Sequence, residues 1–125
     1  MIDLRLNNKW TVYIHIFPKE ITRHNYDKYY VGITSQKIKS RWGKNGRFYK
    51  PKGKKNTSKM WNAIQKYGWD NIKHEIIAEY LTKEEAKQFE ITLIALLKSN
   101  NEYGYNITAG GDTGNPNIFK KNKSI

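Results

Sequence analysis

Four residues of the 125-residue chain carry side chains suited to one kind of chemistry: Tyr13, Tyr30, Arg41 and Glu90. A glutamate can hold a hard divalent cation that polarises a phosphate and stabilises a leaving oxygen. An arginine counters the charge of a phosphorane-like transition state. A tyrosine can take a proton from an attacking water where nearby cations lower its pKa from about 10. These residue types together indicate phosphodiester hydrolysis.

The two tyrosines fall in two predicted strands, residues 10–17 and 29–34, which are rich in β-branched and aromatic residues. The polar link between the strands predicts a long-looped hairpin. Side chains alternate along a strand, and the aliphatic residues occupy one face of each. The other face then carries Tyr13 and Tyr30, with Gly32 leaving room beside them. Packing alone is the competing explanation for two strand tyrosines.

A short predicted helix carries Arg41. Ser35 can cap this helix, and Gly43 can end it. Ile38 lies three residues before Arg41 and four before Trp42, so the three side chains share one side. Arg41 therefore leans toward the hairpin, with a surface arginine that only snorkels as the alternative.

Glu90 lies in the clearest predicted helix, which begins with a capping box of Thr82 and Glu85 and extends to about Ser99. Glu90 falls inside the apolar arc of this helix. The arc consists of Ala86, Phe89, Leu93, Leu96 and Leu97. A carboxylate aimed into a core needs a cation or a metal as its partner. An ion pair with Arg41 or a lysine and metal ligation are both open at this point.

The other segments complete a single domain over residues 1–111. We expect a mobile basic loop over 44–55, a helix over 59–67 capped by Asn56, Thr57 or Ser58 and closed by Gly68, and a third strand over 72–81. Residues 100–111 form a turn-filled segment, and residues 112–125 are expected to be a flexible basic tail.

The positive charge is concentrated in one segment. The net charge is +12, and residues 28–69 contain no acidic residue. Like charges repel one another, so such a segment favours a polyanionic partner, and interleaved aromatic residues such as Tyr49 are candidates for stacking on bases. We expect a nucleic acid, ahead of an anionic membrane surface. The expected contacts are Lys37, Lys44, Arg47, Lys50, Lys52, Lys54, Lys55 and Lys59.

The composition excludes several classes of site. The chain has no cysteine, and therefore no disulfide, thiolate zinc site or cysteine nucleophile. No apolar run approaches membrane-spanning length, and residues 1–9 lack the apolar core of a signal peptide. We expect a cytoplasmic protein, bacterial or in the host cytoplasm if phage-encoded, with no membrane partner and no small-molecule cofactor.

The sequence resembles the GIY-YIG endonuclease family through an ordered set of motifs over residues 10–111. Thr11-Val12-Tyr13 and Tyr30-Val31-Gly32 resemble the two signature triplets, Arg41-Trp42 begins nine residues after Gly32, Glu90 lies in the long helix, and Gly104-Tyr105-Asn106-Ile107 comes near the end. The chain is similar to stand-alone phage or mobile-element members, which include homing endonucleases.

This resemblance implies an α+β fold, a small three-stranded antiparallel sheet flanked by helices, and a metal-dependent DNA endonuclease. Tyr13 and Tyr30 would be the signature tyrosines, one of them acting as general base or positioning the water. Arg41 would bind the phosphate, Glu90 would be the ligand of Mg²⁺ or Mn²⁺, and Asn106 would support the site.

The sequence departs from the family pattern at three positions. Thr11 replaces the glycine of the first triplet, Asn45 stands where members often place a histidine, and Ile33 replaces an occasional lysine. The helper of the tyrosine is therefore unassigned. The candidates are His15, on the strand face of Tyr13, then Lys44 or Arg47, and last His74.

Two other functions fit the same residues. One is a basic nucleic-acid-binding module on the same fold that is catalytically weak or inactive, and the other is a domain that docks an acidic protein. One active site cuts one strand at a time, so an endonuclease of this kind would act on DNA as a monomer or a dimer.

Overall fold

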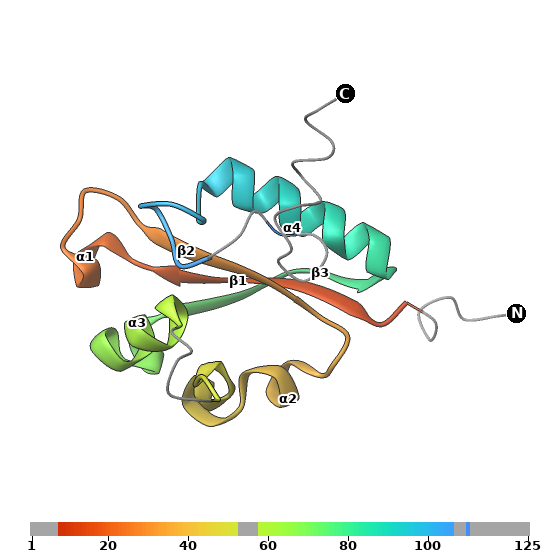
Figure 1. The fold of residues 1–125 in the computed structure, drawn as a ribbon, viewed down its shortest axis with the longest axis horizontal. Helices are drawn as coiled ribbons and strands as arrows, with labels where there is room; N and C mark the ends of the chain where they lie inside the picture. Colours follow the sequence, from red (N-terminus) through yellow and green to blue (C-terminus); the bar gives the residue numbers. More distant parts are fainter. Residues whose placement is uncertain (1–7, 53–57, 107–109, 111–125) are drawn as a thin grey trace, which may run out of the picture.

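The structure is a computed structural model that describes residues 8–52, 58–106 and 110. Three strands and four α-helices account for most of it, with two short 3₁₀ helices labelled η2 and η3 (Figure 1). In chain order they are β1 (Trp10–Phe17), α1 (Lys19–Thr22), β2 (Lys28–Thr34), α2 (Ile38–Trp42), η2 (Lys44–Tyr49), α3 (Lys59–Tyr67), η3 (Trp69–Asn71), β3 (Lys73–Leu81) and α4 (Lys83–Leu97).

The three strands form one antiparallel sheet in the order β2-β1-β3. The central strand β1 therefore places each of its residues between two partners. His15 is paired with Tyr30 on one side and His74 on the other. The predicted α+β fold with a three-stranded antiparallel sheet is confirmed, and the predicted hairpin loop contains the short helix α1.

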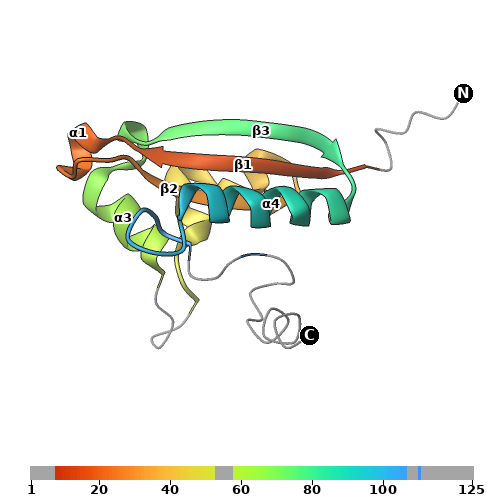
Figure 2. The same cartoon turned by 90° about the horizontal axis from the view of Figure 1, so that it is seen from above.

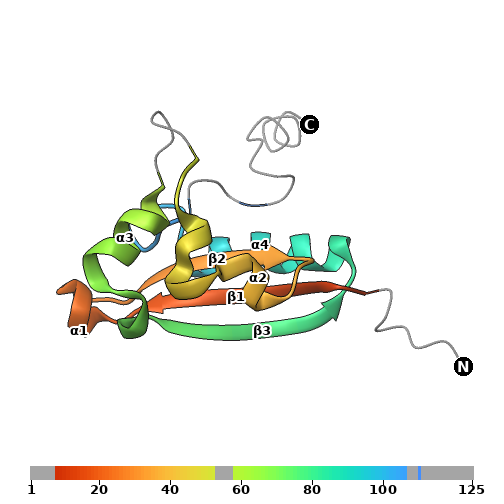
Figure 3. The same cartoon turned by 90° about the horizontal axis from the view of Figure 1, so that it is seen from below.

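Helices cover both faces of the sheet. In Figure 1, α4 lies on one side of the sheet and α2 and α3 lie on the other, and Figure 2 shows α4 running alongside the strands. The α4 side buries aliphatic side chains, among them Val12, Val31 and Ile94. The opposite side, seen in Figure 3, is rich in aromatic rings and buries Phe17 and Tyr49. The alternation along β1 thus separates an aliphatic core from an aromatic one.

Helix α4 has the predicted capping box, in which the Thr82 and Glu85 side chains each accept a backbone hydrogen bond from the other residue. Its predicted apolar arc was wrong at two positions. Leu96 is 73 % exposed and Phe89 is 40 % exposed. Apolar residues surround much of this helix, so the sequence pattern did not define which side packs. The buried side includes Ala86 and Ile94, which join the aliphatic core.

Two predictions about the basic segment were wrong. Helix α2 begins at Ile38 after Lys37, so Ser35 does not cap it, although Gly43 does end it with a φ of 71°. Residues 44–49 of the predicted loop form η2, because Tyr49 is buried in the aromatic core and fixes the chain there.

Helix α3 has its predicted bounds, with the Ser58 side chain accepting from the backbone N–H of Trp61. The alternative caps Asn56 and Thr57, the segment 53–57 and the tail 112–125 lie outside the described residues.

Candidate active site

The Tyr13 ring extends over the neighbouring strand because the residue opposite it is a glycine. Tyr13 is paired with Gly32, and a Cβ atom built on Gly32 would overlap the phenol ring of Tyr13. No part of the Tyr13 surface is exposed (0 %). The glycine therefore lets the Tyr13 hydroxyl reach across β2, which is an edge strand of the sheet.

Replacing Gly32 by alanine is expected to destabilise the protein by about 1–3 kcal/mol, the usual effect of forcing an extra methyl group into a packed core. The new Cβ would displace the Tyr13 ring, so any activity that depends on its hydroxyl should fall as well. Thermal unfolding and a cleavage assay measure the two effects. An unchanged Tm together with an unchanged rate would contradict the close packing of Tyr13 on Gly32.

Arg41 joins the two tyrosine hydroxyls. Its side chain is half-buried, and hydrogen bonds with Arg41 act on both Tyr13 and Tyr30. The guanidinium carbon of Arg41 also lies 4.5 Å from the centre of the Tyr49 ring, a cation–π contact. The structure therefore places Arg41 beside the hairpin, with its charge directed at the tyrosine cluster.

Glu90 approaches this cluster from a helix on the opposite face of the sheet. Burial is the main cause that raises the pKa of Tyr13 and Tyr30, and the nearby Glu90 carboxylate raises both further. Glu90 is half-buried. A Cβ atom built on Gly110 would lie 3.0 Å from its Oε1 atom, so the backbone at Gly110 packs closely against this carboxylate. The edge of the sheet at β2 is where groups from both faces come together.

The donor set at this edge fits a magnesium-type ion. In the part of the chain that the structure describes, no three His, Cys, Asp or Glu side chains gather into a metal-binding group. Mg²⁺ keeps several of its waters and is commonly held by one or two carboxylates together with substrate phosphates. The single half-buried Glu90 carboxylate matches that requirement, whereas a closed site of protein ligands would need more donors.

Asn106 fixes the strand that carries Tyr30. Its side-chain oxygen accepts from the backbone N–H of Val31 at 2.8 Å and from the Ser99 hydroxyl at 2.7 Å. Its amide nitrogen donates to the carbonyl of Val31 at 2.8 Å. Asn106 therefore satisfies both backbone groups of Val31, the residue next to Tyr30 on an edge strand.

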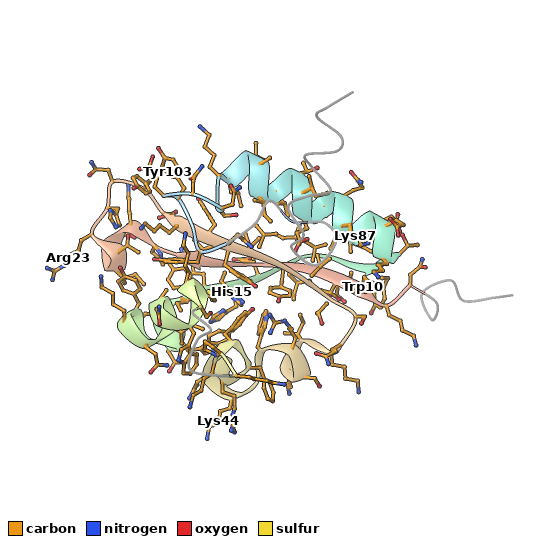
Figure 4. The ribbon with its side chains drawn as sticks, viewed as in Figure 1. Trp10, His15, Arg23, Lys44, Lys87 and Tyr103 are labelled. Carbon is orange, nitrogen blue, oxygen red and sulfur yellow. The ribbon has the colours of Figure 1, made fainter. Side chains whose placement is uncertain are left out.

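A row of hydrogen-bonded side chains leads away from Tyr13. The hydroxyl oxygens of Tyr49 and Tyr13 lie 3.3 Å apart, within hydrogen-bond distance, and the Tyr49 hydroxyl lies 2.7 Å from Nε2 of His15. The Nδ1 atoms of His15 and His74 are 2.8 Å apart, and Nε2 of His74 lies 3.0 Å from the carbonyl oxygen of Trp69. Figure 4 shows His15 in the interior, between the sheet and the helices on its aromatic side.

The sequence did not predict the position of Tyr49 in this row. Tyr49 is a tyrosine in a basic stretch, which suggested stacking on bases, but it is buried. Its neighbour Phe48 is 59 % exposed and takes the outward position instead. One signal was present, since an aromatic residue in a lysine-rich segment is also a candidate anchor for that segment on a core.

Burial raises the pKa of three tyrosines in this cluster, Tyr13, Tyr30 and Tyr49, and the charge of Arg41 opposes the shift in each case. Their hydroxyls are therefore neutral at neutral pH. Burial also lowers the pKa of His15, and to a smaller degree that of His74, so both imidazoles are neutral under the same conditions.

The predicted nucleic-acid contacts lie outside this cluster. Lys37, Lys44, Arg47, Lys50, Lys52 and Lys59 are all exposed. Lys44 points outward from η2, away from the sheet (Figure 4). The two remaining predicted contacts, Lys54 and Lys55, lie outside the described residues. The exposed cations thus lie just before α2, on η2 and directly after it, and at the start of α3, all on the aromatic side of the sheet.

The model of the GIY-YIG catalytic domain matches residues 9–106. The chain therefore belongs to the GIY-YIG family, a family of nucleases that act on nucleic acid. Neither the curated proteins nor the solved structures include one that matches the chain. Among the described residues, no helix has the length and apolar character needed to cross a membrane.

Proposed function

We propose that the protein is a metal-dependent DNA endonuclease that hydrolyses phosphodiester bonds with water as the nucleophile. The observation that carries the proposal is the convergence of Arg41 on the Tyr13 and Tyr30 hydroxyls, with Glu90 close enough to act on both. This geometry can bind a phosphate, orient a water beside it and hold a cation next to it.

In this proposal, each residue has one task. Glu90 holds Mg²⁺ or Mn²⁺, which when bound would polarise the scissile phosphate and stabilise the leaving oxygen. Arg41 binds the phosphate and counters the charge of the transition state. Tyr30 has a neutral hydroxyl and remains partly exposed, so it positions the phosphate by donating a hydrogen bond. Tyr13 receives a proton from the attacking water.

Because Tyr13 is buried, it can receive a proton from the attacking water only if water reaches its hydroxyl. Its hydroxyl has no exposed surface, but it hydrogen-bonds with the half-buried Arg41. A phosphate that draws the Arg41 guanidinium toward itself would open room for a water beside the Tyr13 hydroxyl. Water would then reach the Tyr13 hydroxyl only when a substrate is bound, and the closed site would exclude side reactions with solvent in its absence.

A nicking assay on supercoiled plasmid tests the proposal. Purified protein should convert the plasmid to the open circle in Mg²⁺ or Mn²⁺ and not in excess chelator. One active site cuts one strand, so linear DNA should follow only from a second event or a second protomer. Salt-sensitive DNA binding without cleavage would instead support a binding module that has lost catalysis.

Neutralising the exposed cations of the η2 region is expected to weaken DNA binding. Lys44, Arg47 and Lys50 are exposed, and each phosphate contact contributes about 0.9 to the slope of log K against log salt on duplex DNA. In the triple glutamine variant, the slope of log K against log salt should therefore become shallower by up to about three times 0.9. Fluorescence anisotropy at several salt concentrations measures this slope.

The control for this variant replaces three exposed lysines outside the basic segment, Lys9, Lys19 and Lys73, by glutamine. It removes the same charge, so a nonspecific effect of net charge would appear equally in both proteins. Equal slopes for the two variants would show that η2 does not contact phosphates.

A further inference from the structure

We propose that Tyr49, His15 and His74 form a proton relay that serves Tyr13 and ends at His74. The relay would supply the helper of the catalytic tyrosine, and the inference rests on the proposed nuclease function. Every link is a hydrogen bond of 2.7–3.3 Å between side chains on three different elements, β1, η2 and β3.

The position that family members often use for the helper is not suitable here. Asn45 occupies it, and this residue is exposed, with a left-handed backbone at φ 54° and ψ 32°. Four residues further along, Tyr49 enters the aromatic core and lies between Tyr13 and His15. The contact to Tyr13 is thus made by a different residue of the same segment.

The carbonyl of Trp69 determines the direction of the hydrogen bonds. A carbonyl only accepts, so Nε2 of His74 carries a proton, and in neutral His74 Nδ1 is then bare. His15 must therefore donate from Nδ1 to His74, which leaves its own Nε2 as an acceptor. Tyr49 then donates to His15, and its oxygen accepts from Tyr13. The neutral chain therefore runs from Tyr13 through Tyr49, His15 and His74 to Trp69.

If Tyr49 donates its hydrogen bond to Tyr13 instead of accepting one from it, His74 must be charged. A hydroxyl hydrogen rotates, so Tyr49 can donate to Tyr13 instead, as the 3.3 Å contact also allows. His15 must then donate from Nε2 to Tyr49, and because burial keeps His15 neutral, its Nδ1 carries no proton and accepts from His74. Because His74 still donates to Trp69 from Nε2, it now carries both ring protons and is an imidazolium. The two arrangements differ by one proton moved from Tyr13 to His74.

The proposed step converts the first arrangement into the second. The attacking water gives a proton to the Tyr13 oxygen while the proton of Tyr13 passes to the oxygen of Tyr49. The Tyr49 proton passes to Nε2 of His15, and the Nδ1 proton of His15 passes to Nδ1 of His74. Hydroxide forms beside the phosphate, the tyrosines and His15 end neutral, and His74 ends as an imidazolium. After product release, the reverse movement returns the proton through Tyr13 to water.

A relay explains how the buried Tyr13 can act as a base without first becoming a phenolate. Burial raises the pKa of Tyr13, so a phenolate does not accumulate at neutral pH. A tyrosine that releases its own proton while it accepts another needs no stable phenolate. His74 is a suitable end point because it is half-buried, donates to the Trp69 carbonyl and lies near the Asp70 carboxylate, which favours its charged form. The relay reaches Tyr13, so it assigns proton transfer to Tyr13 rather than Tyr30.

Two substitutions interrupt the relay at different points while keeping the packing. Tyr49→Phe keeps the ring under Arg41 and removes the hydroxyl. His74→Asn keeps an acceptor near the position of Nδ1 but cannot take up a proton. Each variant should lower kcat about 10²-fold, within the usual contribution of general base catalysis, with DNA affinity unchanged. The double variant should be no slower than either single variant, since both break one pathway.

His24→Asn is the matched control, because His24 is exposed and lies outside this row. It should nick at the wild-type rate. If the wild-type protein does not nick in Mg²⁺ or Mn²⁺, the nuclease function itself fails and the relay falls with it. If the wild-type protein nicks but Tyr49→Phe and His74→Asn retain its kcat, the nuclease function stands and the relay is overturned.

A second measurement tests the relay without metal or DNA and with every residue of the relay in place. The chain contains three histidines, so ¹⁵N-histidine labelling gives three imidazole spin systems. His24→Asn identifies one of them, and nuclear Overhauser contacts assign the other two, because the His15 ring stacks on Tyr30 and the His74 ring stacks on Trp69. At neutral pH, His15 should be the neutral Nδ1–H tautomer and His74 the neutral Nε2–H tautomer. The reverse pair of tautomers, or a charged His15, would overturn the relay even if both variants fail to fold.

Discussion

Glu90→Gln is expected to abolish cleavage while leaving the fold and most of the DNA affinity intact. The proposed cation has one protein carboxylate, and glutamine keeps its shape but removes the charge that a hard cation requires. Metal-assisted charge stabilisation contributes several kcal/mol, and each 1.36 kcal/mol is tenfold in rate, so the loss should be about 10³-fold or more. Nicking of supercoiled plasmid in Mg²⁺ measures the rate, and anisotropy in chelator measures the affinity.

Glu84→Gln provides the control, because Glu84 is exposed on the first turn of the same helix. Both substitutions remove one negative charge from α4, so a general gain of DNA affinity should appear in both variants. Only Glu90→Gln should lose the rate. Cleavage by Glu90→Gln at the wild-type rate would show that the metal site lies elsewhere.

The alternation of side chains along two strands predicted the most important part of the site. Because residues two apart share a face, Tyr13 was placed opposite the aliphatic core together with His15. Gly32 was predicted to leave room beside the tyrosines, and the close packing of Tyr13 on Gly32 confirms that geometry. Such local rules depend only on backbone period and steric size, and tertiary structure did not override them here.

Contacts between distant segments could not be predicted in the same way. The pairing of His15 with His74 depends on the register of β1 and β3, which shifts between Trp10 and Val12 and again between Val12 and Tyr13. A single shift of one residue moves a side chain to the other face. The sequence could therefore place His74 in a strand, but not next to His15.

The helix carrying Glu90 shows a related limit. The predicted arc included Phe89 and Leu96 on the basis of hydrophobicity, yet both are exposed. The buried side of α4 instead carries Ala86 and Ile94, which are 0 % and 1 % exposed and belong to the aliphatic core. Glu90, which belongs to this helix, is half-buried and packs against the backbone at Gly110. Glu90 was expected to face inward because it falls inside the arc, and it is half-buried although the arc was wrong at Phe89 and Leu96, because it lies four residues from each of the buried residues Ala86 and Ile94.

Arg41→Ala is expected to cause the second large loss of rate. The guanidinium hydrogen-bonds with both Tyr13 and Tyr30, and its carbon lies 4.5 Å from the centre of the Tyr49 ring. Removing one preorganised donor to a transition-state charge costs about 10²–10³ in kcat. Arg41→Lys keeps the charge but not the planar fork, so it should recover only part of the rate.

Arg47→Ala is the matched control for the Arg41 substitution, because Arg47 belongs to the same basic segment but is exposed. A phosphate contact on the surface should change affinity and its salt dependence, with kcat at saturating DNA retained. Arg41→Ala should instead cause a large fall in kcat, with a change in salt slope no larger than the loss of one phosphate contact, about 0.9. If Arg41→Ala instead weakens binding and keeps kcat, Arg41 is a docking contact. The cluster at the β2 edge would then lack its means of stabilising the transition state.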